Sequence, residues 1–377
     1  MNILVIPSWY PSEFYKNNGI FFKEQAEAFE KNSVNVKVLH IRIPYRKEKV
    51  EYPFFKKNYC IENNIEVYRY VFPFSFLHRF PKMFHVFLKY MGIYLYNKEF
   101  KNQKINVIHA QSFLIGGTIG IAIKKKFGCP CIITEHSSKV LKEDLNKEQL
   151  KQLSNCVDYS NEFVCVSNNL KNKVIELTKS NKDIKVIPNP VSNIFEYKEK
   201  TKCNYFIFTS IGNLIPLKRM DLVIKAFCKA FDKEEKILLN IIGEGTERKK
   251  LQKIIDKEDR ENQISLLGLL TREEVMNHLK ISNVMTLLSE VETFGISYVE
   301  AAMMGNVLIA SNNGGSKDII NNENGLIIND CSIENIAFVF RNILNNYDKY
   351  SPNNIAKIAS EQFSEKKFVE SYLELFK

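Results

Sequence analysis

The segment from Ser289 to Gly305 holds two glutamates at a spacing that suits the binding of a polar ligand. The apolar run 284–288 predicts a strand and the residues after Gly295 predict a helix, so Glu292 lies in the loop between them and Glu300 lies one to two turns into the helix. The first N–H groups of a helix have no partners within it and bind anions and hydroxyl groups. We therefore expect this segment to bind a phosphate or a sugar hydroxyl.

Two basic residues, Lys218 and Arg219, come directly before a second predicted helix, 220–231. Fixed positive charge and a helix N-terminus together stabilise a leaving group that gains negative charge, such as a diphosphate, by several kcal/mol. A metal ion could supply the same charge, but the sequence has no Asp-x-Asp motif, so we expect no metal. The alternative for both residues is a solvated helix start.

The turn Gly243-Glu-Gly245 follows a predicted strand and opens a predicted helix, as in dinucleotide-binding proteins. The third glycine of that motif is missing, and no suitable acidic residue follows about 20 residues later. We interpret it as a tight turn between strand and helix that lines a ligand site.

Short β-rich runs alternate with amphipathic stretches of about 10–15 residues along the chain, which is typical of parallel α/β sheets. One series runs up to Pro188-Asn-Pro190, and a second begins after a polar bridge at 197–204. This pattern predicts two Rossmann-like, doubly wound domains, with ligands at the carboxyl ends of the strands in a cleft that the two domains face. We place the domains at 1–192 and 193–354.

Several motifs in the chain together resemble the retaining GT-B glycosyltransferases of glycosyltransferase family 4. These motifs are the Glu-x7-Glu segment with Phe294-Gly295 inside it, Val186-Ile-Pro-Asn-Pro-Val191, Gly212-Asn-Leu-Ile-Pro-Leu-Lys218, Ile242-Gly-Glu-Gly245, Gly314-Gly315 with Asp318, and Asn324-Gly-Leu326. The resemblance covers nearly the whole chain and implies a GT-B fold. It also implies that residues 355–377 return as a helix to pack on the first domain.

The resemblance implies specific roles in binding a sugar nucleotide. Glu300 would bind the ribose hydroxyls, Glu292 would lie beside the donor sugar as a nucleophile or hydroxyl ligand, and Lys218 would hold the diphosphate. The family often has an Arg where this chain has Asn213, which puts one phosphate contact in doubt, and Arg219 is a possible substitute. The remaining implied donor residues are Gly19, Gly212, Gly243, Thr293, Phe294, Gly295 and Ile296.

The first domain supplies the residues expected near the acceptor. The resemblance implies that the loop after the first strand, which contains Tyr10 and Gly19, forms part of the acceptor site. His136, at the end of the predicted strand 131–134, matches a histidine that the family has beside the reacting groups, and its pKa range suits a general role in catalysis. His109 is a second candidate. For each of these two histidines, and for Gly19, a purely structural role is the alternative.

The net charge of +10 is concentrated in one aromatic-rich region. Residues 41–105 hold 13 Lys and Arg against 5 Asp and Glu, and 17 of the 45 aromatic residues. Within this region, 72–100 reads as a mostly helical amphipathic segment that either packs on its own sheet or binds an anionic membrane surface. No nucleic-acid-binding module accompanies the charge, so we expect no nucleic acid.

The cysteines and the apolar runs indicate a cytoplasmic protein. The eight cysteines form no Cys-x-x-Cys pair, which favours reduced thiols. The apolar run that begins at Met1 is too short for a signal peptide, and the run 105–123 is too polar to span a membrane. We expect a protein at the inner face of the cell membrane.

The function expected from these features is the transfer, with retention, of a hexose-type sugar from a UDP-, GDP- or ADP-sugar to a saccharide or polyprenyl-linked acceptor. Surface polysaccharides such as capsule, O-antigen or teichuronic acid are the expected products. Two alternatives remain: a GT-B sugar-nucleotide epimerase or hydrolase, which would need no acceptor, and a catalytically degenerate binding subunit.

Overall fold

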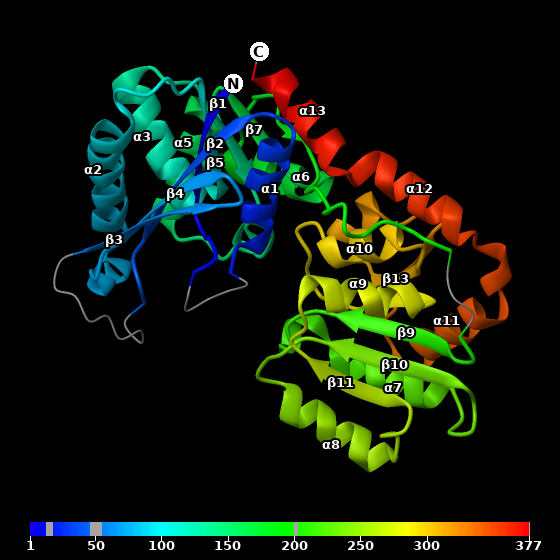
Figure 1. The fold of residues 1–377 in the computed structure, drawn as a ribbon. Coiled ribbons are helices and arrows are strands. Elements are labelled where there is room, and N and C mark those ends of the chain that lie inside the picture. The colour runs from blue at the N-terminus through cyan, green and yellow to red at the C-terminus, as the bar shows by residue number, and fades with distance from the viewer. Residues whose placement is uncertain (13–17, 46–54, 200–202, 377) are drawn as a thin grey trace. The chain divides into compact units, whose positions relative to one another are not determined.

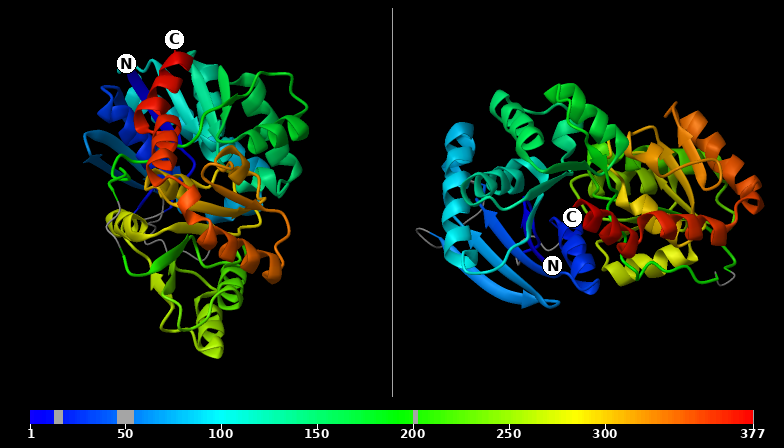
Figure 2. Two further views of the ribbon diagram at one scale, coloured as in Figure 1. Left: turned by 90° about the vertical axis from the view of Figure 1, so that its right-hand side faces the viewer. Right: turned by 90° about the horizontal axis from the view of Figure 1, so that it is seen from above.

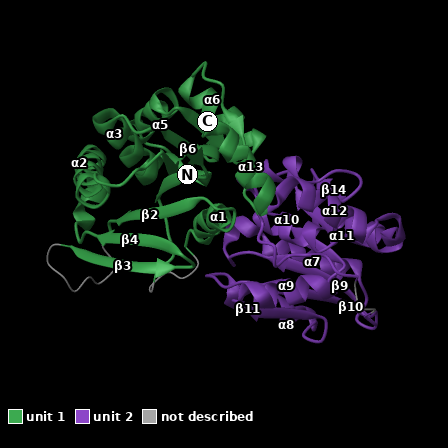
Figure 3. Ribbon diagram, turned by 45° about the horizontal axis from the view of Figure 1, so that its top comes forward, with its two compact units in different colours: residues 1–190, 365–377 green, residues 191–364 purple. Residues whose placement is uncertain are grey.

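The chain folds into two compact units in the computed structural model, which describes residues 1–12, 18–45, 55–199 and 203–376 (Figures 1 and 3). Unit 1 comprises residues 1–190 and 365–377, and unit 2 comprises residues 191–364. The boundary expected at 354 lies close to the beginning of helix α12 (Pro352–Phe363), which the structure includes in unit 2. Only the segment from Glu365 onward belongs to unit 1.

Unit 1 is built on an eight-stranded sheet with the order β3-β4-β2-β1-β5-β6-β7-β8. All neighbouring strands are parallel except β3 and β4, which form an antiparallel pair at one edge. The strands are β1 (Asn2–Pro7), β2 (Asn35–Arg42), β3 (Lys56–Glu62), β4 (Ile65–Val71), β5 (Val107–Gln111), β6 (Cys131–Glu135), β7 (Glu162–Cys165) and β8 (Lys185–Val186). The strand order reverses between β1 and β5, where a doubly wound sheet binds its ligand.

Helices cover both faces of this sheet (Figures 1 and 2). On one face α1 packs against α13, and on the other α3 packs against α2 and α5. The helical segments are α1 (Ile20–Lys31), η1 (Ser75–Arg79), α2 (Pro81–Phe100), η2 (Ser112–Gly117), α3 (Thr118–Phe127), α4 (Ser138–Leu141), α5 (Lys147–Tyr159), α6 (Asn168–Thr178) and α13 (Glu365–Leu375). Of these, η2 is a π-helical turn, a form that is often found at functional sites.

Helix α13 completes the core of unit 1, although it comes from the far end of the chain. The ring of Tyr372 is fully buried and packs edge-on against Phe29, and its hydroxyl lies 2.5 Å from Thr134 Oγ1 on β6. At the start of α13, Glu365 forms an ion pair of 2.9 Å with Lys31. These contacts join the first and last helices of the unit.

Unit 2 has a fully parallel six-stranded sheet with the order β11-β10-β9-β12-β13-β14. Helices α7, α8 and α11 lie on one face, and α9, α10 and α12 on the other. The strands are β9 (Phe206–Ile211), β10 (Ile237–Ile242), β11 (Ile264–Gly268), β12 (Val284–Leu287), β13 (Val307–Ser311) and β14 (Gly325–Ile328). The helical segments are η3 (Pro216–Lys218), α7 (Met220–Ala230), α8 (Arg248–Glu258), α9 (Arg272–Ile281), α10 (Ile296–Met303), η4 (Gly315–Asp318), α11 (Ile333–Asn345) and η5 (Tyr347–Lys349).

Helix α2, expected within the amphipathic segment 72–100, has one buried side and one exposed side. Its inner side is buried against the unit and includes Leu88, Gly92 and Leu95. Its outer side is apolar and aromatic as well as basic. Together with the preceding turn it exposes Phe76, Phe80, Met83, Val86, Tyr90 and Tyr94. Within the described residues, no helix has the length and apolar character needed to cross a membrane.

Candidate functional site

Lys218 and Glu292 meet at the switch point of the unit 2 sheet. The strand order reverses between β9 and β12, so the loops that follow these two strands lie side by side. Lys218 ends the loop after β9, Glu292 lies in the loop after β12, and their side chains form an ion pair. Both side chains are mostly buried, with 17% and 12% of their surface exposed. The two residues expected to handle the diphosphate and the sugar are therefore adjacent.

Backbone hydrogen bonds hold the Glu292 loop in place. The N–H of Glu292 donates to the carbonyl of Asn313 at 3.2 Å, and the N–H of Gly315 donates to the carbonyl of Glu292 at 3.2 Å. On its other side, the N–H of Glu290 donates to the carbonyl of Leu217 at 2.9 Å. The backbone of the loop is thus hydrogen-bonded to the loops that follow both neighbouring strands, β9 and β13.

Gly295 gives helix α10 its start. Its φ of +92° is a conformation that residues with a Cβ rarely adopt, and a Cβ here would lie 2.5 Å from Cδ2 of Tyr298. Tyr298 is fully buried, donates a hydrogen bond of 2.6 Å to the carbonyl of Leu287 and accepts one of 3.0 Å from Asn313. Burial, reinforced by the nearby Glu292 carboxylate, raises the pKa of Tyr298 well above its usual value. A neutral, fixed ring therefore supports the first turn of the helix.

Glu300 lies within α10 and forms an ion pair with Arg272, the first residue of α9. Only 3% of the Glu300 side chain is exposed, against 32% for Arg272. The guanidinium also stacks on the ring of Phe195 at 4.8 Å. Arg272 was missed in the sequence, because 27 residues separate it from Glu300 and no spacing rule links them.

Two glycines expected at the donor site, Gly212 and Gly243, allow two backbone segments to approach closely. Gly243 has a φ of +144°, and a Cβ there would lie 2.0 Å from the carbonyl oxygen of Gly212. A Cβ at Gly212 would in turn lie 3.6 Å from Cδ of Lys218, so the lysine stem passes close to this position. Asn213 is exposed, and Arg219 forms a 3.1 Å ion pair with Glu290.

The remaining predicted donor residues of unit 2 surround the start of α10. Phe294 is buried and packs against Phe363 at 5.7 Å, whereas Thr293 and Ile296 are half-buried. The backbone of Phe294 is in turn close to Gly315, where a Cβ would lie 2.4 Å from the Phe294 carbonyl oxygen. Buried Phe294 thus anchors the loop, while its two neighbours remain partly accessible.

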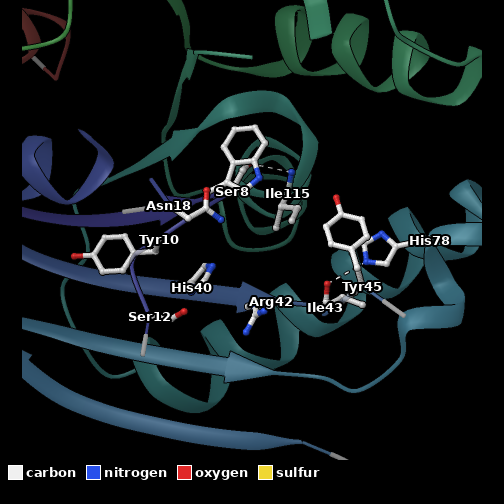
Figure 4. A pocket seen from close by; sticks show the side chains of 11 residues that line it. Ser8, Tyr10, Ser12, Asn18, His40, Arg42, Ile43, Tyr45, His78 and Ile115 are labelled. Atoms are coloured by element: carbon white, nitrogen blue, oxygen red, sulfur yellow. Dashed lines mark hydrogen bonds between the residues drawn. The ribbon is translucent and has the colours of Figure 1, made fainter. Parts of the chain in front are cut away.

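Unit 1 has a cavity of about 210 Å³ at the carboxyl ends of β1 and β2 (Figure 4). Tyr10, an expected acceptor residue, lines it and is almost fully buried. Gly19 caps the start of α1 with a φ of +73°, and a Cβ there would lie 2.7 Å from the backbone of Trp9. Gly19 therefore shapes the loop after β1. Sequence reasoning did not single out the other polar lining residues, Ser8, Ser12, Asn18, His40, Arg42, Tyr45 and His78.

His136 follows β6 and is enclosed by aromatic rings. Its imidazole lies 5.3 Å from the ring of Phe21 and 4.8 Å from that of Phe22. Neither ring nitrogen has a hydrogen-bond partner within the described residues. Burial, with a further contribution from His109, lowers the pKa of His136 well below its usual value, so the ring is neutral at physiological pH. The neutral ring can accept a hydrogen bond, but it is a weak base toward a proton.

Glu135, directly before His136, is a fully buried carboxylate that the sequence analysis did not consider. It accepts hydrogen bonds from the backbone N–H groups of Phe113 (2.8 Å), His136 (3.0 Å) and Ser137 (2.7 Å), and from the Ser112 hydroxyl (3.1 Å). Burial raises its pKa to about 7 despite these donors. Glu135 thereby joins the loop after β6, which holds His136, to the π-helical turn η2 after β5.

His109, the second acceptor candidate, belongs to the core of unit 1. It is fully buried in the middle of β5, packs 4.8 Å from the ring of Tyr372 and hydrogen-bonds Thr134 Oγ1 at 2.8 Å. Burial lowers the pKa of His109 to about 3. The ring is part of the core beneath α13, which is the structural alternative considered for it. Among the described residues, no three His, Cys, Asp or Glu side chains are grouped to hold a metal ion.

Two family models match successive parts of the chain. The model described as "Glycosyltransferase Family 4" matches residues 19–193, and the model described as "Glycosyl transferases group 1" matches residues 193–362. An uncharacterised glycosyltransferase of Methanocaldococcus jannaschii is 29% identical over 60% of this chain. The phosphatidylinositol N-acetylglucosaminyltransferase GPI3 subunit of Saccharomyces cerevisiae is 25% identical over 74%. Each alignment spans 62% of the relative's own length.

Solved structures show the same fold over almost the whole chain. HepE of Anabaena, determined in complex with UDP and glucose, matches with a TM-score of 0.72 at 16% identity and covers 99% of this chain and 98% of its own. The expected GT-B fold is therefore confirmed. The chain therefore has a GT-B fold, and two successive parts of it match these two glycosyltransferase models.

Proposed function

We propose that the chain is a retaining glycosyltransferase that moves a hexose-type sugar from a nucleoside diphosphate sugar to a saccharide or lipid-linked acceptor in the synthesis of a surface polysaccharide. The observation that carries this proposal is the Lys218–Glu292 pair beside the start of α10, at the switch point of the unit 2 sheet. HepE, which was solved with UDP and glucose, supports a sugar nucleotide as the donor.

The residues of unit 2 divide the work of donor binding. Lys218 and the first N–H groups of α10 neutralise the diphosphate as the glycosidic bond to it breaks. Glu300 accepts hydrogen bonds from the ribose hydroxyls, and Arg272 holds its carboxylate in position. Glu292 lies beside the sugar, and both a covalent intermediate on it and a same-face substitution within an ion pair agree with this placement.

No metal is needed in this scheme, because the charge that a metal would supply comes from Lys218 and the helix start. We therefore propose a metal-independent reaction. On the acceptor side, His136 offers two unpartnered ring nitrogens to a sugar hydroxyl. The low pKa of its imidazole favours orientation of that hydroxyl over strong base catalysis.

A donor panel tests this function. UDP-, GDP- and ADP-sugars are scored by thermal shift and by slow release of the nucleotide, with and without EDTA. We expect one nucleotide to stabilise the protein, with no effect of EDTA, and the anomeric configuration of the product to match that of the donor. Glu300→Gln should abolish the shift, whereas Glu361→Gln, at an exposed position on α12, should preserve it. An unchanged shift in Glu300→Gln would refute the site.

We further propose that the outer side of α2 places the protein on anionic membranes. Its exposed apolar side chains lie among basic residues, namely Arg79 of the preceding η1 and Lys82, Lys89 and Lys98 of α2, as in helices that lie in a membrane interface. Lys82→Glu combined with Lys89→Glu should abolish co-sedimentation with phosphatidylglycerol liposomes. The matched pair Lys125→Glu and Lys126→Glu, on α3, should not. Equal binding by both pairs would contradict this assignment.

A further inference from the structure

The unit 1 cavity is built from four separate parts of the chain. Trp9 and Tyr10 come from the loop after β1, and His40, Arg42 and Ile43 come from the end of β2 and just after it. His78 comes from η1, and Ile115 comes from η2. The cavity thus lies where the carboxyl ends of the strands of unit 1 meet, the region in which an α/β sheet binds ligands. At about 210 Å³ it is smaller than the roughly 300–1,000 Å³ typical of sites for drug-sized ligands. Such a size suits one sugar residue or its phosphate.

Arg42 brings a permanent positive charge to the cavity. Arg42 is the one permanently charged residue among the described residues that line it, and these include no Asp or Glu. Burial, followed by the charges of Arg69 and Arg42, lowers the pKa of His40 to about 3, so His40 is neutral. Arg69 forms an ion pair of 2.6 Å with Glu62 and lies behind the ring of Tyr10, 5.3 Å from its centre. An anion entering the cavity therefore meets the guanidinium of Arg42.

The walls of the cavity are aromatic. Tyr45 stacks on His78 with the ring centres 4.4 Å apart and the planes 16° from parallel. His78 Nε2 donates a hydrogen bond of 3.0 Å to the carbonyl of Ile43, which fixes the plane of the pair. Figure 4 shows Arg42 between Ser12 and this stacked pair. Flat rings beside a cation and a hydroxyl can hold the apolar face of a sugar while its anionic substituent binds the cation.

We propose that this cavity binds a phosphate group of the acceptor, with Arg42 as its cationic partner and the Tyr45–His78 pair against the adjoining sugar. The inference rests on the proposed glycosyltransferase function and gives its acceptor a chemical class, a phosphorylated saccharide. The phosphate belongs either to a water-soluble sugar phosphate or to the head group of a polyprenyl lipid.

Trp9 provides a direct reading of occupancy, because it lines the cavity and is the single tryptophan of the chain. The full chain is titrated at constant ionic strength with inorganic phosphate, with glucose 1-phosphate, and with undecaprenyl phosphate in detergent micelles, while Trp9 fluorescence is followed. Methyl glucoside and potassium chloride serve as ligand controls. We expect at least one phosphate ligand to give a saturable change and the controls to give none.

Four variants locate the anion. Arg42→Met should weaken the response at least tenfold, whereas Arg42→Lys, which keeps the charge, should retain most of it. Lys126→Met removes an exposed charge of the same unit and should change nothing. Lys218→Met removes the cation of the donor site, so a response that persists in it arises in unit 1.

The outcomes separate this inference from the proposed function. Loss of the response in Arg42→Met with persistence in Lys218→Met supports the inference, and the responding ligand shows whether the phosphate is soluble or lipid-bound. No response to any phosphate, or an equal response in Arg42→Met, overturns it. Slow hydrolysis of the sugar nucleotide without acceptor is measured separately in the wild-type protein, as the test of the proposed function. Absence of that hydrolysis in the wild-type protein refutes the proposed function instead.

Discussion

Replacing Gly295 by alanine adds one methyl group at the start of α10 and should damage both stability and donor binding. The residue has a φ of +92°, and the left-handed region costs a residue with a Cβ roughly 1–2 kcal/mol. The new Cβ would lie 2.5 Å from Tyr298, and overpacking of this kind costs about 1–3 kcal/mol. The ring cannot swing away, because its hydroxyl is hydrogen-bonded to Leu287 and Asn313. The expected total is about 2–5 kcal/mol.

The assay is thermal unfolding with and without the nucleotide found by the donor panel. For a unit of this size, 1 kcal/mol corresponds to roughly 2–4 °C, so the melting temperature of unit 2 should fall by about 4–20 °C. The affinity for the nucleotide should also fall, because the first N–H groups of α10 move with Gly295.

Gly128→Ala is the matched control. Gly128 has a φ of +73°, but nothing lies within 4 Å of the position of its Cβ, so only the backbone cost of about 1–2 kcal/mol should appear. Nucleotide affinity should be unchanged, because Gly128 lies at the end of α3 in unit 1. If Gly295→Ala were no more destabilising than Gly128→Ala and bound nucleotide normally, the assigned role of the α10 start would be wrong.

Three further predictions concern the donor cation, the last helix and pH. Lys218→Met should lower kcat by about 10²–10³-fold, as the loss of one preorganised donor does. Lys229→Met, on the surface of α7, should leave kcat unchanged. Equal kcat values for the two variants would refute the role of Lys218. Tyr372→Ala should destabilise unit 1 by about 3–5 kcal/mol, and Tyr372→Phe by about 1 kcal/mol. Urea unfolding followed by Trp9 fluorescence measures both. Equal losses of unfolding free energy in the two variants would mean that the ring packing is unimportant. Buried histidines with lowered pKa values bind protons only when unit 1 unfolds, so each should weaken the unit by up to about 1.4 kcal/mol per pH unit below pH 6.5. Glu135, whose carboxyl has a raised pKa, should instead stabilise unit 1 as the pH falls from 7 to 4.5. The histidines together outweigh this single carboxyl, so the urea midpoint should be lower at pH 5.5 than at pH 7.5. A constant midpoint would contradict the burial of these rings. The histidines concerned are His40, His85, His109 and His136.

The sequence predicted most of the elements because buried parallel strands are continuous apolar runs. In unit 2 the strand expected at 284–288 and the helix expected at 220–231 each end one residue earlier, as β12 (Val284–Leu287) and α7 (Met220–Ala230), and the helix expected after Gly295 is α10. Strand β3 was missed because its composition is polar and charged, and as an antiparallel edge strand it keeps most of its side chains at least partly exposed. Helix α5 was also missed; its apolar positions are few and its mean hydropathy is low.

The part of the candidate site that is formed by residues close together in the sequence was predictable. Glu292, Gly295 and Glu300 belong to one strand–loop–helix segment, so a local pattern was sufficient. Arg272 was not predictable, because its pairing with Glu300 depends on how two helices pack. The four donors to Glu135 include Ser112, whose φ of +64° no sequence pattern indicates. The unit 1 cavity likewise needs β1, β2 and η1 to be brought together.

The position of α13 has a consequence for the order in which the protein folds during synthesis. All residues of unit 2 leave the ribosome before Glu365, whereas the core of unit 1 lacks Tyr372 until α13 emerges. Unit 2 can therefore reach its native state first. Part of the apolar surface of residues 1–190 stays exposed to solvent until α13 has been synthesised. A chaperone that binds nascent chains should protect unit 1 for longer than unit 2, although unit 1 begins at the N-terminus.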